Sequence, residues 1–263
     1  MPTKAPSRMI AELSSPEVGK LLRESSILCL PIGSIEQHGP HLPLNTDAVL
    51  AEEYVRRIVA RFGETYDCWQ LPTLAVSLAR EHEWAPGTLS LSLAGMSALL
   101  RDLGRTIARG LPARNLAVVN GHGGNRGILE ALAQDLRADF ALNVCVLHPA
   151  VWMDAGAPAG LPDIHGGKNE TSLMLAIAPQ LVRREAIAQL KNPPDGDRVR
   201  RTVLDLAVTW PWRSDDSDVA DLGIIGDARA GSAEFGNRLL EQVVERAGGV
   251  LKELLERQRL ARG

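Results

Sequence analysis

Apolar runs of strand length alternate with longer amphipathic stretches along most of this chain. The apolar runs span residues 26–33, 69–76, 115–120 and 142–147. The stretches with apolar residues at helical spacing span residues 46–62, 93–109, 126–138, 170–178 and 232–258. Strands that alternate with helices in this way form a sheet with helices on both faces. The pattern therefore predicts an α/β fold, a three-layer α/β/α sandwich with a mainly parallel central sheet.

Residues 191–228 break this alternation. They combine several prolines, aspartates and arginines with the sequence Trp210-Pro-Trp212. We expect an irregular excursion here, which covers a site or makes subunit contacts. In a parallel sheet, sites form at the carboxyl ends of the strands. Two histidine-containing clusters, in residues 36–47 and 120–125, follow predicted strands or end one and are therefore expected at that edge.

The composition is that of an ordinary globular protein, with 263 residues of which 45% are hydrophobic and 23% charged. A formal net charge of −3 with scattered charges gives no reason to expect nucleic acid or a membrane surface as a partner. No apolar run approaches the ~18 residues of a membrane span. Three widely separated cysteines favour free thiols in a reducing compartment. With no signal peptide evident, we expect a soluble cytoplasmic protein.

The loop after the first predicted strand carries candidate metal ligands. Glu36 and His38 lie two residues apart, so at a strand end their side chains project to the same side. Asp47 follows at the start of an amphipathic helix. Two carboxylates and an imidazole form a nitrogen and oxygen ligand set that suits zinc, manganese or ferrous iron.

Three of the six histidines stand beside glycine in loops. His38 precedes Gly39, His122 lies within Asn-Gly-His-Gly-Gly-Asn, and His165 precedes two glycines. Glycine lets the backbone and a substrate approach each other closely. A lone histidine is more often a structural hydrogen-bonding residue, but the setting of His38 and His122 together favours metal binding.

Five stretches of the chain together resemble the creatininase family. They are residues 33–47 (GSIEQHGPHLPLNTD), 81–88 (EHEWAPGT), 120–125 (NGHGGN), 165–172 (HGGKNETS) and 226–234 (GDARAGSAE). They span nearly the whole chain in family order, and the first and third are specific. The resemblance implies one α/β/α domain over residues 1–263, a two-metal amidohydrolase site and a homo-oligomer, often a hexamer.

The resemblance also implies how the ligands are shared between two divalent metal ions. Glu36 and His122 would bind one ion and His38 the other, while Asp47 would bridge them with its two oxygens. Zinc is the first expectation, with manganese or iron as alternatives. Two such ions would lower the pKa of a shared water and polarise the scissile carbonyl of an amide.

The chain departs from creatininase itself beside His122. Creatininase has a tyrosine and a glutamate where this chain has Gly123 and Gly124, so the second metal needs another acid. Glu170, in the first turn of a predicted helix, is the candidate replacement. The alternative is that Glu170 only stabilises the N-terminus of that helix with its negative charge.

The resemblance implies a catalytic role for His165. The family places an acid next to this histidine, and this chain has Ile164 there. His165 can still donate to a developing oxyanion or carry a proton to the leaving nitrogen, roles that suit a pKa near 6.5. The alternative is a structural loop histidine.

Four further polar residues lie in or near these motifs. For His41, between two prolines, a supporting role is favoured over metal ligation. His82 either lines a pocket or lies in an exposed loop. Asn120 and Asn125 are expected to fix the loop that carries His122.

These observations favour a metal-dependent amidohydrolase that cleaves the C–N bond of a small-molecule amide with a metal-activated water. The Gly-Gly form of the motif resembles family members that hydrolyse formamides or trim a short peptide in cofactor biosynthesis, so a peptidase is an alternative. A third hypothesis is a non-catalytic protein with a structural metal site, because two family residues are missing. Structural zinc sites are usually closed by four protein ligands.

Overall fold

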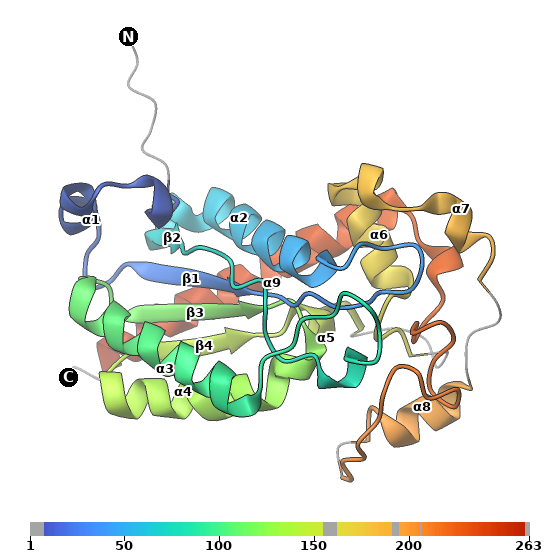
Figure 1. Ribbon diagram of the computed structural model, residues 1–263. Helices are drawn as coiled ribbons and strands as arrows, with labels where there is room; N and C mark the ends of the chain where they lie inside the picture. Colours follow the sequence, from blue (N-terminus) through green and yellow to red (C-terminus); the bar gives the residue numbers. More distant parts are fainter. Residues whose placement is uncertain (1–7, 155–161, 191–194, 206, 261–263) are drawn as a thin grey trace.

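Four parallel strands form the central sheet in the part of the chain that the structure describes. This computed structural model describes residues 8–154, 162–190, 195–205 and 207–260. The strands are β1 (Ile27–Ile32), β2 (Cys68–Gln70), β3 (Asn115–Asn120) and β4 (Asn143–Leu147), and they lie in the order β2-β1-β3-β4. Helices surround this sheet (Figure 1). The predicted α/β fold with a parallel sheet is confirmed.

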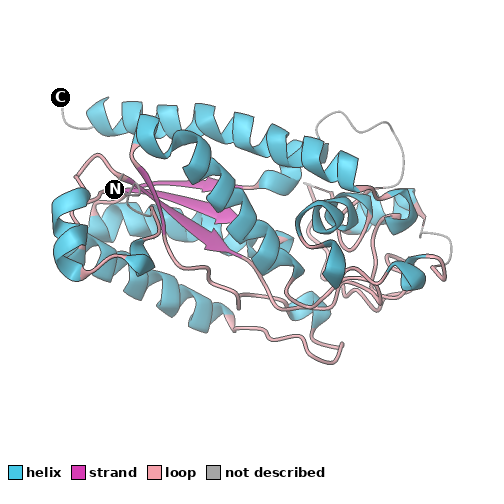
Figure 2. Cartoon of the chain, turned by 90° about the horizontal axis from the view of Figure 1, so that it is seen from above, coloured by secondary structure: helices cyan, strands magenta, loops and turns pink. Residues whose placement is uncertain are grey.

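The helices form two layers, one on each face of the sheet (Figures 1 and 2). One layer contains α2 (Thr46–Tyr66), α6 (Lys168–Ile177) and α9 (Ala233–Leu260), and the other contains α3 (Leu93–Gly110) and α4 (Arg126–Phe140). Along β1, Ile27 and Cys29 pack with the first layer, and Leu28, Leu30 and Ile32 pack with the second. Successive strand side chains point to opposite faces, so a strand covered on both faces is apolar throughout.

The amphipathic stretches become helices that bury one face. In α3, Met96, Leu100 and Ile107 are buried at the spacing of helical turns. This helix begins after Ser92, whose side-chain oxygen accepts a hydrogen bond from the N–H of Gly95. In the described ranges, no helix combines the length and the apolar character that crossing a bilayer requires.

Shorter helices complete the described chain. They are α1 (Ser15–Leu21), α5 (Pro149–Asp154), α7 (Arg184–Ile187) and α8 (Gly196–Thr202), with 3-10 turns at Ile10–Glu12, Arg80–His82, Gly123–Asn125, Pro179–Leu181 and Ala228–Ala230. The predicted irregular excursion, residues 191–228, contains α8 and is otherwise mostly loop. Its residues 191–194 and 206 lie outside the described part of the chain.

One strand is shorter than the sequence pattern predicts. The apolar run over residues 69–76 predicts a full strand, but β2 ends at Gln70, and Leu74 then makes an isolated bridge with Ile32. Pro72 has no N–H group for a strand ladder, so it ends the pairing. β2 lies at the edge of the sheet, which is one of the positions expected for a strand with this proline.

The strand order creates a switch point between β1 and β3. From β1 the chain leads to β2 on one side, and it later returns to form β3 on the other side. Parallel register pairs Ile32, the last residue of β1, with Asn120, the last residue of β3. The loops that follow these residues leave the sheet side by side, in the position where α/β proteins form their sites.

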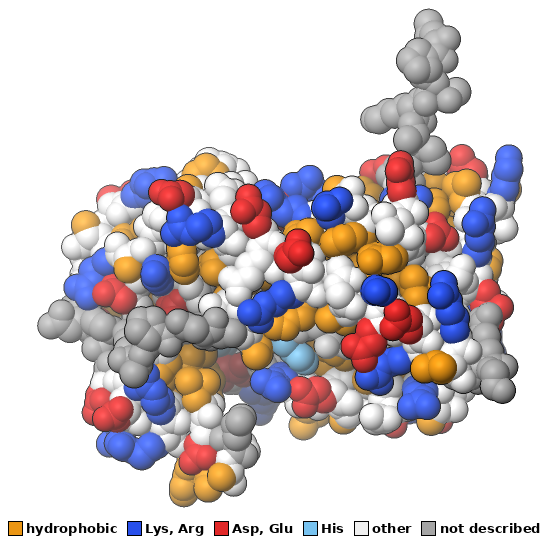
Figure 3. All heavy atoms as spheres, turned by 180° about the vertical axis from the view of Figure 1, so that it is seen from behind, with side chains coloured by type: hydrophobic (Ala, Val, Ile, Leu, Met, Phe, Trp, Pro, Cys, Tyr) orange, Lys and Arg blue, Asp and Glu red, His pale blue; other side chains and the backbone are white. Residues whose placement is uncertain are grey.

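Charged side chains of both signs are mixed over the face of the molecule opposite to the view of Figure 1. Figure 3 shows Lys and Arg side chains close to Asp and Glu side chains, with apolar groups between them. Such mixing gives this face no extended field of one sign.

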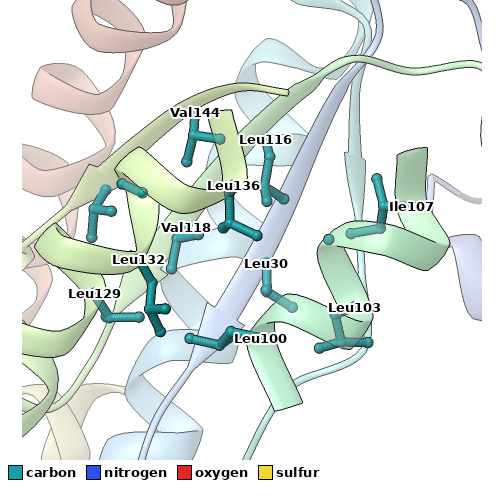
Figure 4. Close-up of a pocket in the computed structure, with 13 residues that line it drawn as sticks. Leu30, Leu100, Leu103, Ile107, Leu116, Val118, Leu129, Leu132, Leu136 and Val144 are labelled. Carbon is teal, nitrogen blue, oxygen red and sulfur yellow. The ribbon is translucent and has the colours of Figure 1, made fainter. Parts of the chain in front are cut away.

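A small apolar cavity lies between the sheet and the layer of α3 and α4 (Figure 4). Its volume is about 10 Å³, and its walls are aliphatic side chains such as Leu30, Leu100, Val118 and Leu132. A single water needs roughly 10–15 Å³ and several polar partners. We interpret this cavity as a packing void, because it is apolar and too small for a ligand.

Candidate metal centre

Four acidic and histidine side chains converge at the carboxyl end of the sheet. Glu36 and His38 lie in the loop after β1, Asp47 lies in the first turn of α2, and His122 lies in the loop after β3. All four are buried, with at most 4% of their surface exposed. Two segments about 75 residues apart in the chain therefore meet, as strands of a parallel sheet allow.

The first group of candidate ligands surrounds one ring nitrogen of His122. This Nδ1 atom lies 3.1 Å from Glu36 Oε1 and 3.1 Å from Asp47 Oδ2. Tetrahedral zinc with bonds of about 2.0–2.1 Å holds neighbouring ligand atoms about 3.4 Å apart. All three ligand atoms lie within 4.8 Å of one another, so their spacing suits a single metal ion.

The second group surrounds His38. Its Nε2 atom lies 3.0 Å from Asp47 Oδ1 and 3.6 Å from Glu170 Oε2. Glu170 lies in the first turn of α6, and its Oε2 also accepts a hydrogen bond of 2.6 Å from the N–H of Gly166. Asp47 belongs to both groups, with one oxygen facing each histidine.

Several buried oxygens of this cluster have no hydrogen bond of normal geometry to a described residue. They are both carboxylate oxygens of Glu36 and the Oδ2 atom of Asp47. A buried ionised oxygen without a partner costs free energy. Divalent cations at the two groups would satisfy these oxygens, so the donor set fits the metal ions that the resemblance implies.

Close packing between the end of β1 and the start of α2 sets these distances. Gly33 directly follows β1, and a Cβ atom at this position would lie 2.4 Å from the Cα atom of Ala48. The missing side chain lets the loop approach the first turn of α2, which brings Asp47 near Glu36. The N-terminus of α2 also favours the negative charge of Asp47.

Burial and mutual charge shift the pKa values of the cluster. Burial, reinforced by the charge of Asp47, raises the pKa of Glu36 to about 7 and the pKa of Glu170 to about 8. Burial opposes a charge on His38, but the charges of Asp47 and Glu170 outweigh it and raise the His38 pKa to about 10. Metal ligands must give up such protons, so metal affinity is expected to rise with pH.

His165 lies beside both groups and presents one ring nitrogen to them. Its Nε2 atom lies 2.6 Å from the carbonyl oxygen of Gln37, which can only accept, and 3.1 Å from the side-chain amide nitrogen of Gln37. The shorter contact favours the tautomer with its proton on Nε2. The Nδ1 atom then faces Glu36 Oε1 at 3.6 Å with its lone pair. Burial, together with His82 and His38, lowers the pKa of His165 well below its usual value. The neutral ring can accept a proton or bind a cation at Nδ1.

The other two histidines of these loops have different surroundings. His82 is 2% exposed, so the exposed loop position that the sequence left open is wrong, and its Nε2 lies 3.4 Å from Glu36 Oε1. Burial lowers the pKa of His82 to about 3. His41 Nε2 lies 2.8 Å from Thr171 Oγ1, next to Glu170 in the chain. This contact gives His41 the supporting position that the sequence favoured.

Asn120 and Asn125 hold the loop of His122 as expected. The side-chain amide of Asn120 donates to the carbonyl oxygen of His122 at 2.7 Å. The side-chain oxygen of Asn125 accepts from the N–H of Leu78 at 3.2 Å. These bonds tie the loop to its own strand and to the segment after β2.

Three polar residues of the site were not selected from the sequence. Gln37 donates from Nε2 to Ser214 Oγ at 3.1 Å, and Ser214 donates from its backbone N–H to the carbonyl oxygen of Glu81 at 3.0 Å. The carboxylate of Glu81 lies 3.5 Å from His122. No local pattern marks Ser214 as a partner. Gln37 and Glu81 each lie in one of the five family-like stretches, and that signal could have identified them.

An open pocket of about 870 Å³ adjoins the cluster. Its walls include His122, His165 and Glu170 from the cluster, with Trp212 and Arg213 from the excursion over residues 191–228. The excursion therefore covers part of the site, which is one of the two roles expected for it. The pocket gives a substrate access to the candidate ligands.

Comparisons with known proteins agree with the motifs. A family model described as creatinine amidohydrolase matches residues 11–251. The chain belongs to the creatininase family. Membership makes it a hydrolase of the creatininase type, which acts on C–N bonds, as the sequence predicts.

Individual members of the creatininase family resemble the chain over most of its length. The mycofactocin precursor peptide peptidase of Mycobacterium tuberculosis is 32% identical over 243 residues, which cover 90% of this chain and 89% of that protein. The creatinine amidohydrolase of Pseudomonas putida is 28% identical over 252 residues, covering 86% and 89%.

Solved creatininases share the fold. A crystal structure of creatinine amidohydrolase superposes with a TM-score of 0.74 at 26% identity, covering 96% of this chain and 98% of that one. Similar structures include a manganese form and a zinc–zinc form of a variant, each with a TM-score of 0.75. They support divalent metals for this family, while the hexamer stays a prediction.

Proposed function

We propose that this chain hydrolyses an amide C–N bond at a two-metal centre. Glu36, Asp47 and His122 would hold one divalent cation. His38 and Glu170 would hold the other together with Asp47. The observation that carries the proposal is the position of Asp47, whose two oxygens face the two histidines at 3.0 Å and 3.1 Å. A carboxylate in this position can bridge cations ~3.5–4 Å apart.

The shape of the site favours catalysis over a structural role. Each group offers three protein ligands and lies next to the open pocket, whereas structural sites are closed by four protein ligands. When bound, the two cations would supply a water of lowered pKa and would polarise the carbonyl group. The hypothesis of a non-catalytic protein with a structural metal site is therefore disfavoured.

His165 would transfer a proton from the attacking water to the leaving nitrogen. Its Nε2 proton is held by the carbonyl oxygen of Gln37, so Nδ1 is the atom that faces the cluster. A neutral ring first accepts a proton at Nδ1 from the attacking water and then donates it to the leaving nitrogen. His165, which the sequence predicts as a proton donor, would thus first act as a general base.

The size of the pocket favours a substrate that extends beyond the reacting amide. A volume of about 870 Å³ exceeds the needs of a compact amide, and it lies within the ~300–1,000 Å³ of pockets for larger ligands. The relative from Mycobacterium tuberculosis is named as a peptidase for a precursor peptide. We therefore place a short peptide ahead of creatinine, with a small-molecule amide as the second candidate.

A substrate panel tests this proposal. The purified protein would be analysed for metal content and then incubated with creatinine, formamides and short peptides, each with and without chelator. We expect about two ions per chain and chelator-sensitive cleavage of a peptide amide bond. A protein that carries two ions and cleaves no member of the panel would contradict the proposed function.

Replacing His165 with alanine should lower kcat while the metal content stays the same. Loss of a general acid or base costs roughly 10²–10⁴-fold in rate, and KM should change less than kcat because the other pocket walls remain. Elemental analysis and steady-state kinetics measure both effects. If His165→Ala instead loses a metal ion, His165 is a ligand, in line with the spacing of its ring to Glu36 and His38.

A further inference from the structure

The ring of His122 has a second nitrogen, which points away from the candidate metal ligands. Its Nδ1 atom faces Glu36 and Asp47, while its Nε2 atom faces the carboxylate of Glu81, with Oε1 at 3.5 Å. We infer that Glu81 is a positioning residue, which holds the Nε2–H group of His122 and thereby presents Nδ1 to the metal. This inference rests on the ligand role of His122 in the proposed function.

The chemistry of a metal-bound imidazole requires such a partner. A neutral ring that offers the lone pair of one nitrogen carries its proton on the other, so Nδ1 ligation places the proton on Nε2. Histidine ligands almost always donate this proton to a carboxylate, a backbone carbonyl or water, which fixes the ring and raises its basicity. Among the described residues, Nε2 has no hydrogen-bond partner within normal geometry. Glu81 is the acid within reach.

Gly124 leaves the space in which this contact forms. A Cβ atom at position 124 would lie 2.3 Å from Glu81 Oε1 and 2.4 Å from His122 Nε2, closer than atoms can approach. Any side chain there must displace the carboxylate or turn the ring. At the neighbouring Gly123, a Cβ atom would meet nothing within 4 Å. A side chain is therefore accommodated at Gly123 but not at Gly124, although both glycines lie in the same loop.

The backbone of Glu81 is held independently of its carboxylate. Its carbonyl oxygen accepts a hydrogen bond of 3.0 Å from the N–H of Ser214, and the residue lies in the 3-10 turn Arg80–His82. Removing the carboxylate leaves these backbone contacts in place. A variant of the Glu81 side chain can therefore test the contact to His122 without removing the segment that carries it.

The test measures zinc affinity in the full chain after metal removal, by competition with a chromophoric chelator. Glu81→Ala should weaken binding by about 10- to 100-fold. Glu81→Gln, which keeps an acceptor oxygen but loses the charge, should recover part of this loss. Gly124→Ala should weaken binding at least as much as Glu81→Ala, because the methyl group also presses on the ring. Gly123→Ala is the matched control and should keep the affinity of the unchanged protein.

A second measurement reads the ring directly. Long-range proton–nitrogen NMR of the zinc-loaded protein should find the His122 proton on Nε2. A proton on Nδ1, or a Glu81→Ala protein with unchanged zinc affinity, would overturn the inference. These outcomes differ from failure of the proposed function, in which the unchanged protein binds no metal or binds it without cleaving an amide. Equal losses in Gly123→Ala and Gly124→Ala would also overturn it.

Discussion

Replacing Asp47 with alanine should remove both metal ions and nearly all activity. Asp47 is the residue that both groups share, with Oδ1 at 3.0 Å from His38 and Oδ2 at 3.1 Å from His122. Metal ions contribute several kcal/mol to transition-state stabilisation. We therefore expect kcat/KM to fall by about 10³-fold or more. Elemental analysis of the variant, together with kinetics on the best substrate of the panel, measures the two losses.

Two further variants make this experiment specific. Asp47→Asn keeps the size of the side chain and removes its charge. If this variant folds but loses its metal, the loss reflects the role of Asp47 as a ligand and not its role in packing. Glu52→Ala removes an exposed carboxylate from the same helix and should change neither quantity. If Asp47→Asn keeps two ions and its activity, Asp47 does not bridge the metals.

Chelation of the metal should give a folded but inactive protein. The two apolar clusters that hold the sheet between its helix layers contain none of the candidate ligands, so we expect them to persist without metal. Binding stabilises the native state by about 2.7 kcal/mol when free metal exceeds its dissociation constant 100-fold. We thus expect a lower Tm, an unchanged far-ultraviolet circular dichroism spectrum, and activity below about 1% of the starting value.

Readdition of metal completes this experiment. Zinc or manganese should restore activity, and their relative effects would show which metal the ligands prefer. Loss of helical structure on chelation would favour the structural metal site that the sequence left open. Full activity in a protein shown to lack metal would remove the proposed mechanism.

Much of the architecture could be predicted because it depends on short-range patterns. The strand over residues 115–120 is buried on both faces, so its apolar run is visible without any tertiary information. The helix that begins at Leu93 shows its buried side through helical spacing. The strand after α2 was overestimated because apolar residues continue past Pro72, where the missing N–H group ends the pairing.

The candidate site could be predicted only in part from the sequence. Glu36, His38 and Asp47 lie within twelve residues, and their spacing alone suggests a shared metal. The resemblance added His122 and led to Glu170 as a candidate. The contact between Glu81 and His122 was not foreseen, since it depends on how the segment after β2 packs on the loop after β3.

The order of the residues in the chain was enough to establish the layers of the fold and the chemical types of the candidate ligands. Periodic burial and the coordination preferences of carboxylates and imidazoles are local properties, so they can be recognised in the amino-acid sequence alone. The division of the two oxygens of Asp47 between two histidines became visible with the packed chain. So did the orientation of the His122 ring toward Glu81, because both follow from side chains that segments distant in sequence bring into contact.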